Sequence, residues 1–115
     1  MDEFVLIFRH ENANGMVPPA QIQQWMQQTM EWLNGIAEQG KLVSHGYGLA
    51  FEDSRIVHHG GKVSEGPFGG EFEKIGGYVI IRAESADEAA ELAKGSPVLN
   101  GPDNTIEVRR VAKSK

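Results

Sequence analysis

The strongest constraint in the sequence is a short run of β-branched and aromatic residues at 78–81, placed directly after the pair Gly76 and Gly77. Such side chains are typical of a buried β-strand. Paired glycines at the start of a strand indicate a bulge or the close approach of another backbone. We therefore predict a central strand here. The loop that starts with Glu-Gly-Pro-Phe at residues 65–68 would lie at one end of it, where a pocket would form.

Residues 4–8 are apolar at consecutive positions, which predicts another central strand covered on both faces, and the polar residues 11–15 predict a loop. The Pro-Pro pair at 18–19 predicts the start of a long helix, and Gly40 fits its C-terminal cap. Apolar side chains then recur at spacings of three and four and predict one stripe, made of Ile22, Trp25, Met26, Met30, Leu33, Ile36 and Ala37. Trp32 lies off this stripe, so we expect it to line a surface or cover an interface.

The middle of the chain has the pattern of a β-meander. Residues 42–51 are strand-like, residues 52–54 predict a turn, residues 55–58 a returning strand and residues 59–62 a second turn.

A capping box starts the next helix, because Ser85 can accept a hydrogen bond from the amide of Glu88 while the carboxylate of Glu88 reaches back. The helix has small side chains suited to packing close to a sheet, and Gly95 and Pro97 end it. Residues 105–109 alternate strictly between apolar and polar, which predicts a last strand with one solvated face.

This order of elements predicts an α+β fold of the ferredoxin-like type, a split βαβ sandwich formed by residues 1–115 as a single domain. Two helices cover one face of a four-stranded antiparallel sheet and leave the other face bare. Because the two central strands are apolar on both sides, we expect the bare face to meet a partner. The simplest partner is a second copy, sheet against sheet, with two-fold symmetry.

Composition excludes several classes of protein. The net charge of −5, from 16 acidic and 11 basic side chains, argues against binding to nucleic acid or to anionic lipid. The absence of cysteine excludes disulfides, thiolate metal sites and a cysteine nucleophile. No apolar run approaches the ~20 residues that span a membrane, and the acidic N-terminus is unlike a signal peptide. We expect a cytoplasmic protein.

Three segments together, residues 65–68, 76–81 and 85–89, resemble the YCII-related proteins of the DGPF type. The motif of that type is Asp-Gly-Pro-Phe, an acidic loop, Gly-Gly-Tyr/Phe, an apolar strand and Ser-x-Asp-Glu-Ala. The likeness continues into the last strand and spans about residues 4–111. The resemblance implies a ferredoxin-like fold that dimerises in the manner of the dimeric α+β barrels. For the broader group it also implies a pocket with a histidine and an aspartate as acid–base candidates.

The chain departs from these patterns at three places. Glu65 replaces the aspartate of the Asp-Gly-Pro-Phe motif, which keeps the charge and adds one methylene of reach. Ser96 and Pro97 stand where the broader group has Asp-Pro before the last strand, and this chain has no histidine at the start of its first helix.

Three side chains are candidates for acid–base catalysis. Glu65 could act as a general base beside the aromatic Phe68 and Phe72, or it could hold loop amides as a structural carboxylate. His10 follows the first strand and His45 is taken to precede the second, so both could face one end of the sheet and transfer a proton there. Either histidine could equally be hydrogen-bonded without a catalytic role.

Phe68 and Ser96 are candidate ligand-binding residues. We expect no metal site, because His58 and His59 are adjacent and point to opposite faces of a strand. We expect no cofactor either, since Gly60-Gly61 and Gly76-Gly77 lack the spacing of a phosphate-binding loop.

The prediction for function is therefore a homodimer with a small-molecule pocket, and with proton transfer, elimination or hydrolysis as the possible chemistry. The alternative is a module that binds a ligand or a protein without catalysis.

Overall fold

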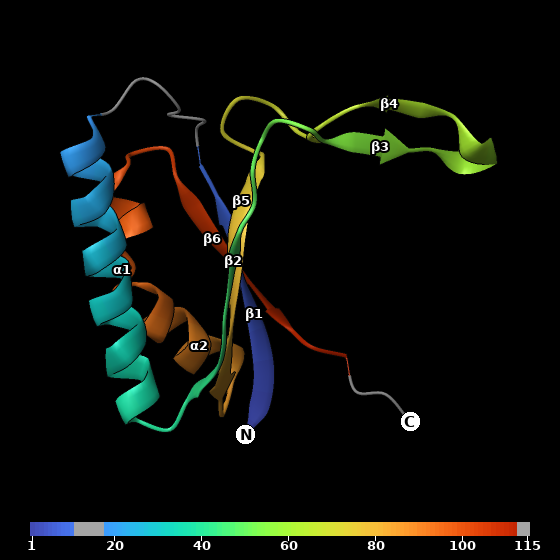
Figure 1. Ribbon diagram of the computed structural model, residues 1–115. Helices are drawn as coiled ribbons and strands as arrows, with labels where there is room; N and C mark the ends of the chain where they lie inside the picture. Colours follow the sequence, from blue (N-terminus) through green and yellow to red (C-terminus); the bar gives the residue numbers. More distant parts are fainter. Residues whose placement is uncertain (11–17, 113–115) are drawn as a thin grey trace.

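The computed structural model describes residues 1–10 and 18–112 (Figure 1). The predicted loop at residues 11–15 lies outside them. The described elements are β1 (Asp2–Arg9), α1 (Pro19–Glu38), β2 (Leu42–Gly48), β3 (Arg55–Val57), the 3-10 turn η1 (His59–Gly61), β4 (Val63–Glu65), β5 (Ile75–Ala83), α2 (Ala86–Ala93), the 3-10 turn η2 (Pro97–Asn100) and β6 (Thr105–Arg110).

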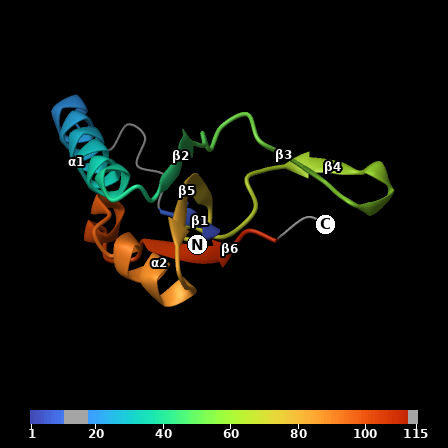
Figure 2. The same cartoon turned by 90° about the horizontal axis from the view of Figure 1, so that it is seen from below.

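The four longer strands form one antiparallel sheet in the order β2-β5-β1-β6. Both helices lie on the same side of it, as the two views in Figures 1 and 2 agree. This arrangement confirms the predicted α+β class with a split βαβ topology. The sheet is open, so the described part of one chain forms no closed barrel.

The core lies between the sheet and the helices. The ladder pairs Phe4 with Ile81 and Leu6 with Val79, and all four side chains are buried on the helix-covered face. Burying each such side chain stabilises the fold by about 1.5–3 kcal/mol. The whole buried apolar set is Phe4, Leu6, Leu33, Ile36, Val79, Ile81, Ala83, Ala89 and Ala93. The two alanines of α2 allow that helix to approach the sheet closely.

The N-terminal caps are as expected. Pro18 precedes the first turn of α1, and Ser85 Oγ accepts the amide of Glu88 at 3.1 Å. The carboxylate of Glu88 reaches the amide of Glu84, one residue beyond the expected position. Gly40 follows α1 with a φ of 72°, a left-handed conformation that favours glycine.

The predicted stripe of α1 is wrong over its N-terminal half. Leu33 and Ile36 are buried, but the more N-terminal apolar residues are exposed: Ile22 by 40%, Trp25 by 41%, Met26 by 64% and Met30 by 46%. Trp32, expected at a surface, packs against Phe8 with ring centroids 6.2 Å apart, and its Nε1 donates to the carbonyl of Leu92 at 2.9 Å. Only the C-terminal half of α1 therefore contributes to the core.

The middle of the chain differs from the predicted meander. Strand β2 stops at Gly48, and β3 and β4 form a separate two-stranded sheet. The reason is topological: β5 already pairs with β2 on one edge and β1 on the other, so β4 has no free edge of β5 to join. The resulting hairpin projects from the sheet on the side opposite the helices (Figures 1 and 2).

No helix in the described residues is both long enough and apolar enough to cross a membrane.

Candidate functional site

His10 occupies a well-defined place where β1 ends. Its ring lies so close to Gly76 that a Cβ at that position would overlap the imidazole. The ring also packs against Phe51, with centroids 5.5 Å apart, and the His10 amide donates to the carbonyl of Lys74. Glycine at position 76 therefore leaves room for this imidazole at the end of the sheet, since any larger residue would force the ring to move.

The second glycine of the pair has a different role. A Cβ on Gly77 would lie 3.0 Å from the carbonyl oxygen of Tyr47 and 3.3 Å from the Cα of Gly48. In addition, the ladder between β1 and β5 shifts register between Phe8 and Arg9. Both readings of the glycine pair, a strand irregularity and a close backbone approach, are thus confirmed.

The Gly-Pro corner is tied to the same end of the sheet. The amide of Gly66 donates to the carbonyl of Ser54 at 3.1 Å, and Ser54 Oγ donates to the carbonyl of Phe51 at 3.1 Å. Phe51 is the residue that packs on His10. Two hydrogen bonds and one ring contact therefore connect the corner to the seated imidazole.

The motif side chains on either side of this corner are open to solvent. Glu65 is exposed at the end of β4, opposite Arg55 in the ladder, and Phe68 is 78% exposed. In one chain, the residues brought to the end of the sheet are therefore Gly66 and His10, while the side chains of Glu65 and Phe68 are exposed.

His45 lies apart from His10. It sits inside β2 and is exposed, directly before Gly46, whose φ of 61° marks an irregularity in the pairing of β2 with β5. A Cβ on Gly46 would overlap the carbonyl of Tyr78. Because His10 follows β1 and His45 lies within β2, the two imidazoles do not share the end of the sheet in this chain.

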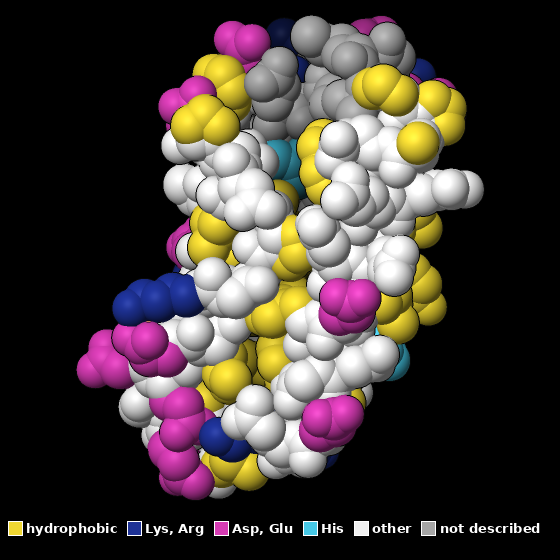
Figure 3. All heavy atoms as spheres, turned by 90° about the vertical axis from the view of Figure 1, so that its left-hand side faces the viewer, with side chains coloured by type: hydrophobic (Ala, Val, Ile, Leu, Met, Phe, Trp, Pro, Cys, Tyr) yellow, Lys and Arg dark blue, Asp and Glu magenta, His cyan; other side chains and the backbone are white. Residues whose placement is uncertain are grey.

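Ser96 belongs to the helix layer. It is 5% exposed, and its Oγ caps η2 by accepting the amide of Val98 at 3.3 Å. It also lines an open cavity of about 610 Å³ between α1 and the segment after α2. The other lining residues are Gln28, Glu31, Trp32, Lys94, Gly95, Pro97, Leu99 and Asn100. Figure 3 views the helix layer and shows hydrophobic side chains at the bottom of a furrow.

Trp32 forms a wall of this cavity, and its Nε1 is held by the hydrogen bond to the carbonyl of Leu92. The sequence predicted that Trp32 would line a surface, but it did not predict the packing of the indole on Phe8. The signal available was its spacing: Trp32, Leu33 and Ile36 share one face of α1, and that face is the buried one.

A second pair missed from the sequence lies on the hairpin. His58 Nε2 and Ser64 Oγ are 2.8 Å apart across the two strands. The available signal was that a turn at residues 59–62 places His58 opposite Lys62, which makes Ser64 the diagonal neighbour of His58 on the same face.

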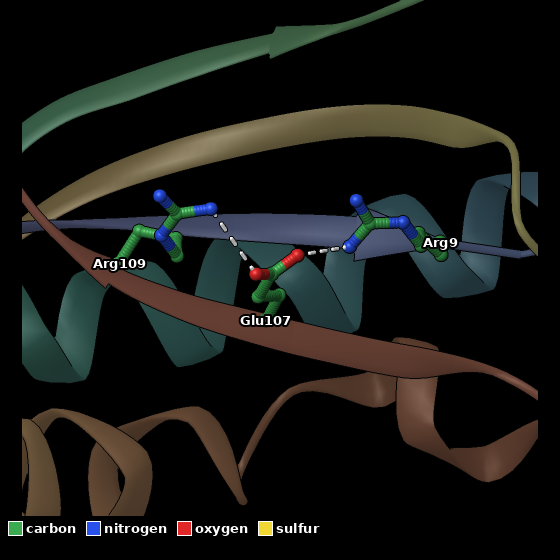
Figure 4. A network of polar contacts seen from close by, with 3 residues as sticks. All are labelled: Arg9, Glu107 and Arg109. Carbon is green, nitrogen blue, oxygen red and sulfur yellow. Dashed lines mark hydrogen bonds and ion pairs between the residues drawn. The ribbon is translucent and has the colours of Figure 1, made fainter. Parts of the chain in front are cut away.

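The open face of the sheet carries an ion-pair network rather than a proton-transfer site. Arg9 Nη1 lies 2.6 Å from Glu107 Oε1, and Arg109 Nη1 lies 3.4 Å from Oε2 (Figure 4). The hydrogen bond from Arg9 is the main cause that lowers the pKa of Glu107, with Arg109 adding to it. A carboxylate held ionised in this way suits a structural role. The described residues contain no cluster of three or more histidine or acidic side chains able to hold a metal.

These features define the class of the protein: an α+β sandwich with helices on one sheet face, a Gly-Pro corner at the end of the sheet and an open second face. A family model described as the YCII-related domain matches residues 3–115, and the chain therefore belongs to the YCII-related family. The resemblance noted in the sequence is thereby confirmed at the level of the family. A search of curated proteins finds no match to the chain.

Proposed function

We propose that the protein is a homodimer that binds a small organic molecule at the end of its sheet and transfers a proton to or from it. The observation that carries this proposal is the position of His10, whose ring lies in the space left by Gly76, packs on Phe51 and is connected to the Gly66 corner. A preorganised imidazole is suited to acid–base catalysis near neutral pH. Elimination and hydrolysis are the reactions that such a group serves.

The proposal of a dimer is supported by the sheet face that the helices leave open. The ladder pairs Ile7 with Tyr78 and Val5 with Ile80 on this face, and each side chain is only partly buried. Next to them on β2, Tyr47 is 74% exposed and contacts the ring of Tyr78. A contiguous apolar strip of this kind favours a second copy as its cover.

Glu65 and Phe68 complete the proposed pocket as its rim. Their exposure in the single chain fits a site whose outer wall comes from the second copy. We also propose that the protein belongs to the DGPF type within its family, that residues 1–115 act as one domain, and that it resides in the cytoplasm.

The test follows the imidazole of His10 by NMR while small carboxylic, hydroxy and keto acids are added to the purified dimer. A ligand that uses this site should shift the His10 signal at millimolar concentration, and His10→Ala should lose the binding. His45→Ala is the matched control and should retain it. If no acid in the panel perturbs His10, the proposed site is wrong.

The second candidate is ligand binding without catalysis, and the cavity beside Ser96 favours it. Its volume of about 610 Å³ lies within the range of about 300–1,000 Å³ usual for ligand sites. The chain has two tryptophans, so Trp25→Phe leaves Trp32 as the only indole fluorophore. Small aromatic acids and amines that bind here should change the fluorescence of that variant. No change with any of them would contradict this candidate.

A further inference from the structure

The hairpin of β3 and β4, residues 55–65 and hereafter the arm, lacks cover from the described residues of its own chain. Its strands pack mainly against each other, and it projects on the open side of the sheet (Figures 1 and 2). The radius of gyration is 15.4 Å, whereas a compact chain of this length has about 13 Å. Because an isolated two-stranded hairpin is at best marginally stable in water, the arm needs a surface to pack on.

One face of the arm carries an apolar pair. Val57 and Val63 are ladder partners and are 71% and 55% exposed. On the root side of this pair the same face continues with Arg55 opposite Glu65. The arm therefore presents an apolar spot that its own chain leaves in solvent.

The two ends of the arm differ in charge. The tip, residues 58–62, carries His58, His59 and Lys62, all exposed. The root, residues 51–54 and 65–73, carries the exposed acidic side chains Glu52, Asp53, Glu65, Glu71 and Glu73. Lys62 gives the tip a positive charge in a chain whose net charge is −5, so tip and root are complementary to each other.

We propose that the arms of two copies lie side by side and antiparallel, each tip resting on the root of the other. This arrangement, hereafter the clasp, rests on the proposed homodimer. A two-fold axis makes the two tip-to-root contacts identical, as an isologous interface requires. It also brings together the Val57 and Val63 pairs of the two arms near the axis.

The length of the arm fits this geometry. From Arg55 to His59 the hairpin extends about 13 Å at about 3.3 Å per residue. Two packed sheets are separated by about 10 Å. An arm that leaves one sheet on its open side therefore spans the gap and reaches the second copy.

The clasp has a consequence for the site. The tip of the partner arm places the partner's His59 over the root that holds Glu65 and Phe68. Each pocket then has one imidazole from its own His10 and one from the partner subunit. The rim that is open in a single chain is closed by the dimer, so the site is incomplete without the second copy.

The first test is a charge exchange read by sedimentation equilibrium. Lys62→Glu at the tip and Glu71→Lys at the root should each weaken the dimer about tenfold, because attraction becomes repulsion at both symmetric contacts. The double variant restores opposite charges and should return the dissociation constant to within about threefold of the unaltered protein. Lys94→Glu at the C-terminal cap of α2, in the helix layer, is the matched control and should leave the dissociation constant unchanged.

The outcomes separate the clasp from the dimer itself. If the unaltered protein is monomeric at all concentrations, the proposed homodimer and the clasp are both wrong. If it dimerises but the single variants bind as tightly as the unaltered protein, or the double variant stays as weak as the singles, only the clasp is wrong.

The second test locates the tip directly. Because the chain has no cysteine, His59→Cys offers a unique attachment point for a photoreactive benzophenone. In a mixture of ¹⁴N- and ¹⁵N-labelled chains, cross-links between a ¹⁴N chain and a ¹⁵N chain should fall on residues 51–54 or 65–73. Cross-links between copies that fall only on the helices, or cross-links confined to one chain, would overturn the clasp.

Discussion

The two central strands place apolar side chains on both faces of the sheet, and the two faces have very different surroundings. Along β1, Leu6 is fully buried under the helices, while its neighbour Ile7 is only partly buried on the open face. One apolar strand thus places side chains on two faces, and among the described residues only one of these faces is covered, by the two helices. The difference teaches that an apolar strand face indicates a need for cover, but it does not indicate whether the cover is a helix of the same chain or another molecule.

The largest expected effect comes from removing side chain volume on the covered face. Leu6→Ala should lower the free energy of unfolding by about 2–5 kcal/mol, because the helices can only partly close the cavity. Urea denaturation at low protein concentration measures it. Ile7→Ala, one residue along, should cost clearly less under the same conditions. Equal costs for the two variants would show that the chain covers both faces by itself.

The same two variants, Leu6→Ala and Ile7→Ala, also test the two sheet faces when the protein concentration is raised. If a second copy covers the open face, the cost of Ile7→Ala should grow with protein concentration, since dimerisation stabilises only the folded state. The cost of Leu6→Ala should stay constant.

The next effect concerns the end of the sheet. Gly76→Ala would place a methyl group into the ring of His10, and we expect a loss of about 1–3 kcal/mol together with a displaced imidazole. NMR signals of His10 report the displacement, and denaturation reports the loss. Gly35→Ala in α1, where a Cβ meets nothing within 4 Å, is the control and should be neutral or stabilising. An unshifted His10 in Gly76→Ala would contradict the seating.

A smaller effect on stability is expected from substitutions in α1, where the two halves of the helix can be compared. Trp32→Phe removes the donor to the Leu92 carbonyl and part of the contact with Phe8, so we expect a loss of about 1–2 kcal/mol. Trp25→Phe on the exposed half should change stability by less than about 0.5 kcal/mol. Thermal denaturation of both variants measures the difference. A larger cost for Trp25→Phe would show that the N-terminal half of α1 is packed in solution.

The smallest effect lies on the open face and depends on pH. Arg9 lowers the pKa of Glu107 below its ordinary value of 4.5, so the ionised carboxylate stabilises the fold above that pH. This contribution is lost as the pH falls through the lowered pKa. Glu107→Gln should therefore be slightly less stable at pH 7, and the difference should vanish in acid. Glu3→Gln on β1 is the control. A difference that persists at pH 2 would refute the ionic origin.

Much of the fold could be predicted from local patterns. The Pro-Pro start of α1, the cap at Ser85 and the alternation in β6 each depend on a few neighbouring residues, and each is found as expected. The glycine pair was also interpreted correctly, because only glycine permits such close approaches.

The candidate site was predictable only in part. His10 was singled out because it follows a strand, yet nothing in the sequence indicated that Phe51 would pack on it. His45 was chosen by the same local reasoning and Ser96 by its place in the family motif, but the structure places them within β2 and in the helix layer. Distances between segments far apart in the chain depend on strand pairing, which local patterns do not encode.

The sequence by itself determined which segments are strands and helices, since period, capping and glycine placement are local properties. It also determined that the central strands need cover on both faces. Only the tertiary structure decided that β5 pairs with β2 and β1, which excludes β3 and β4 and turns them into a projecting arm. The physical reason is that a strand has two hydrogen-bonding edges, and the competition for them is settled by the whole chain.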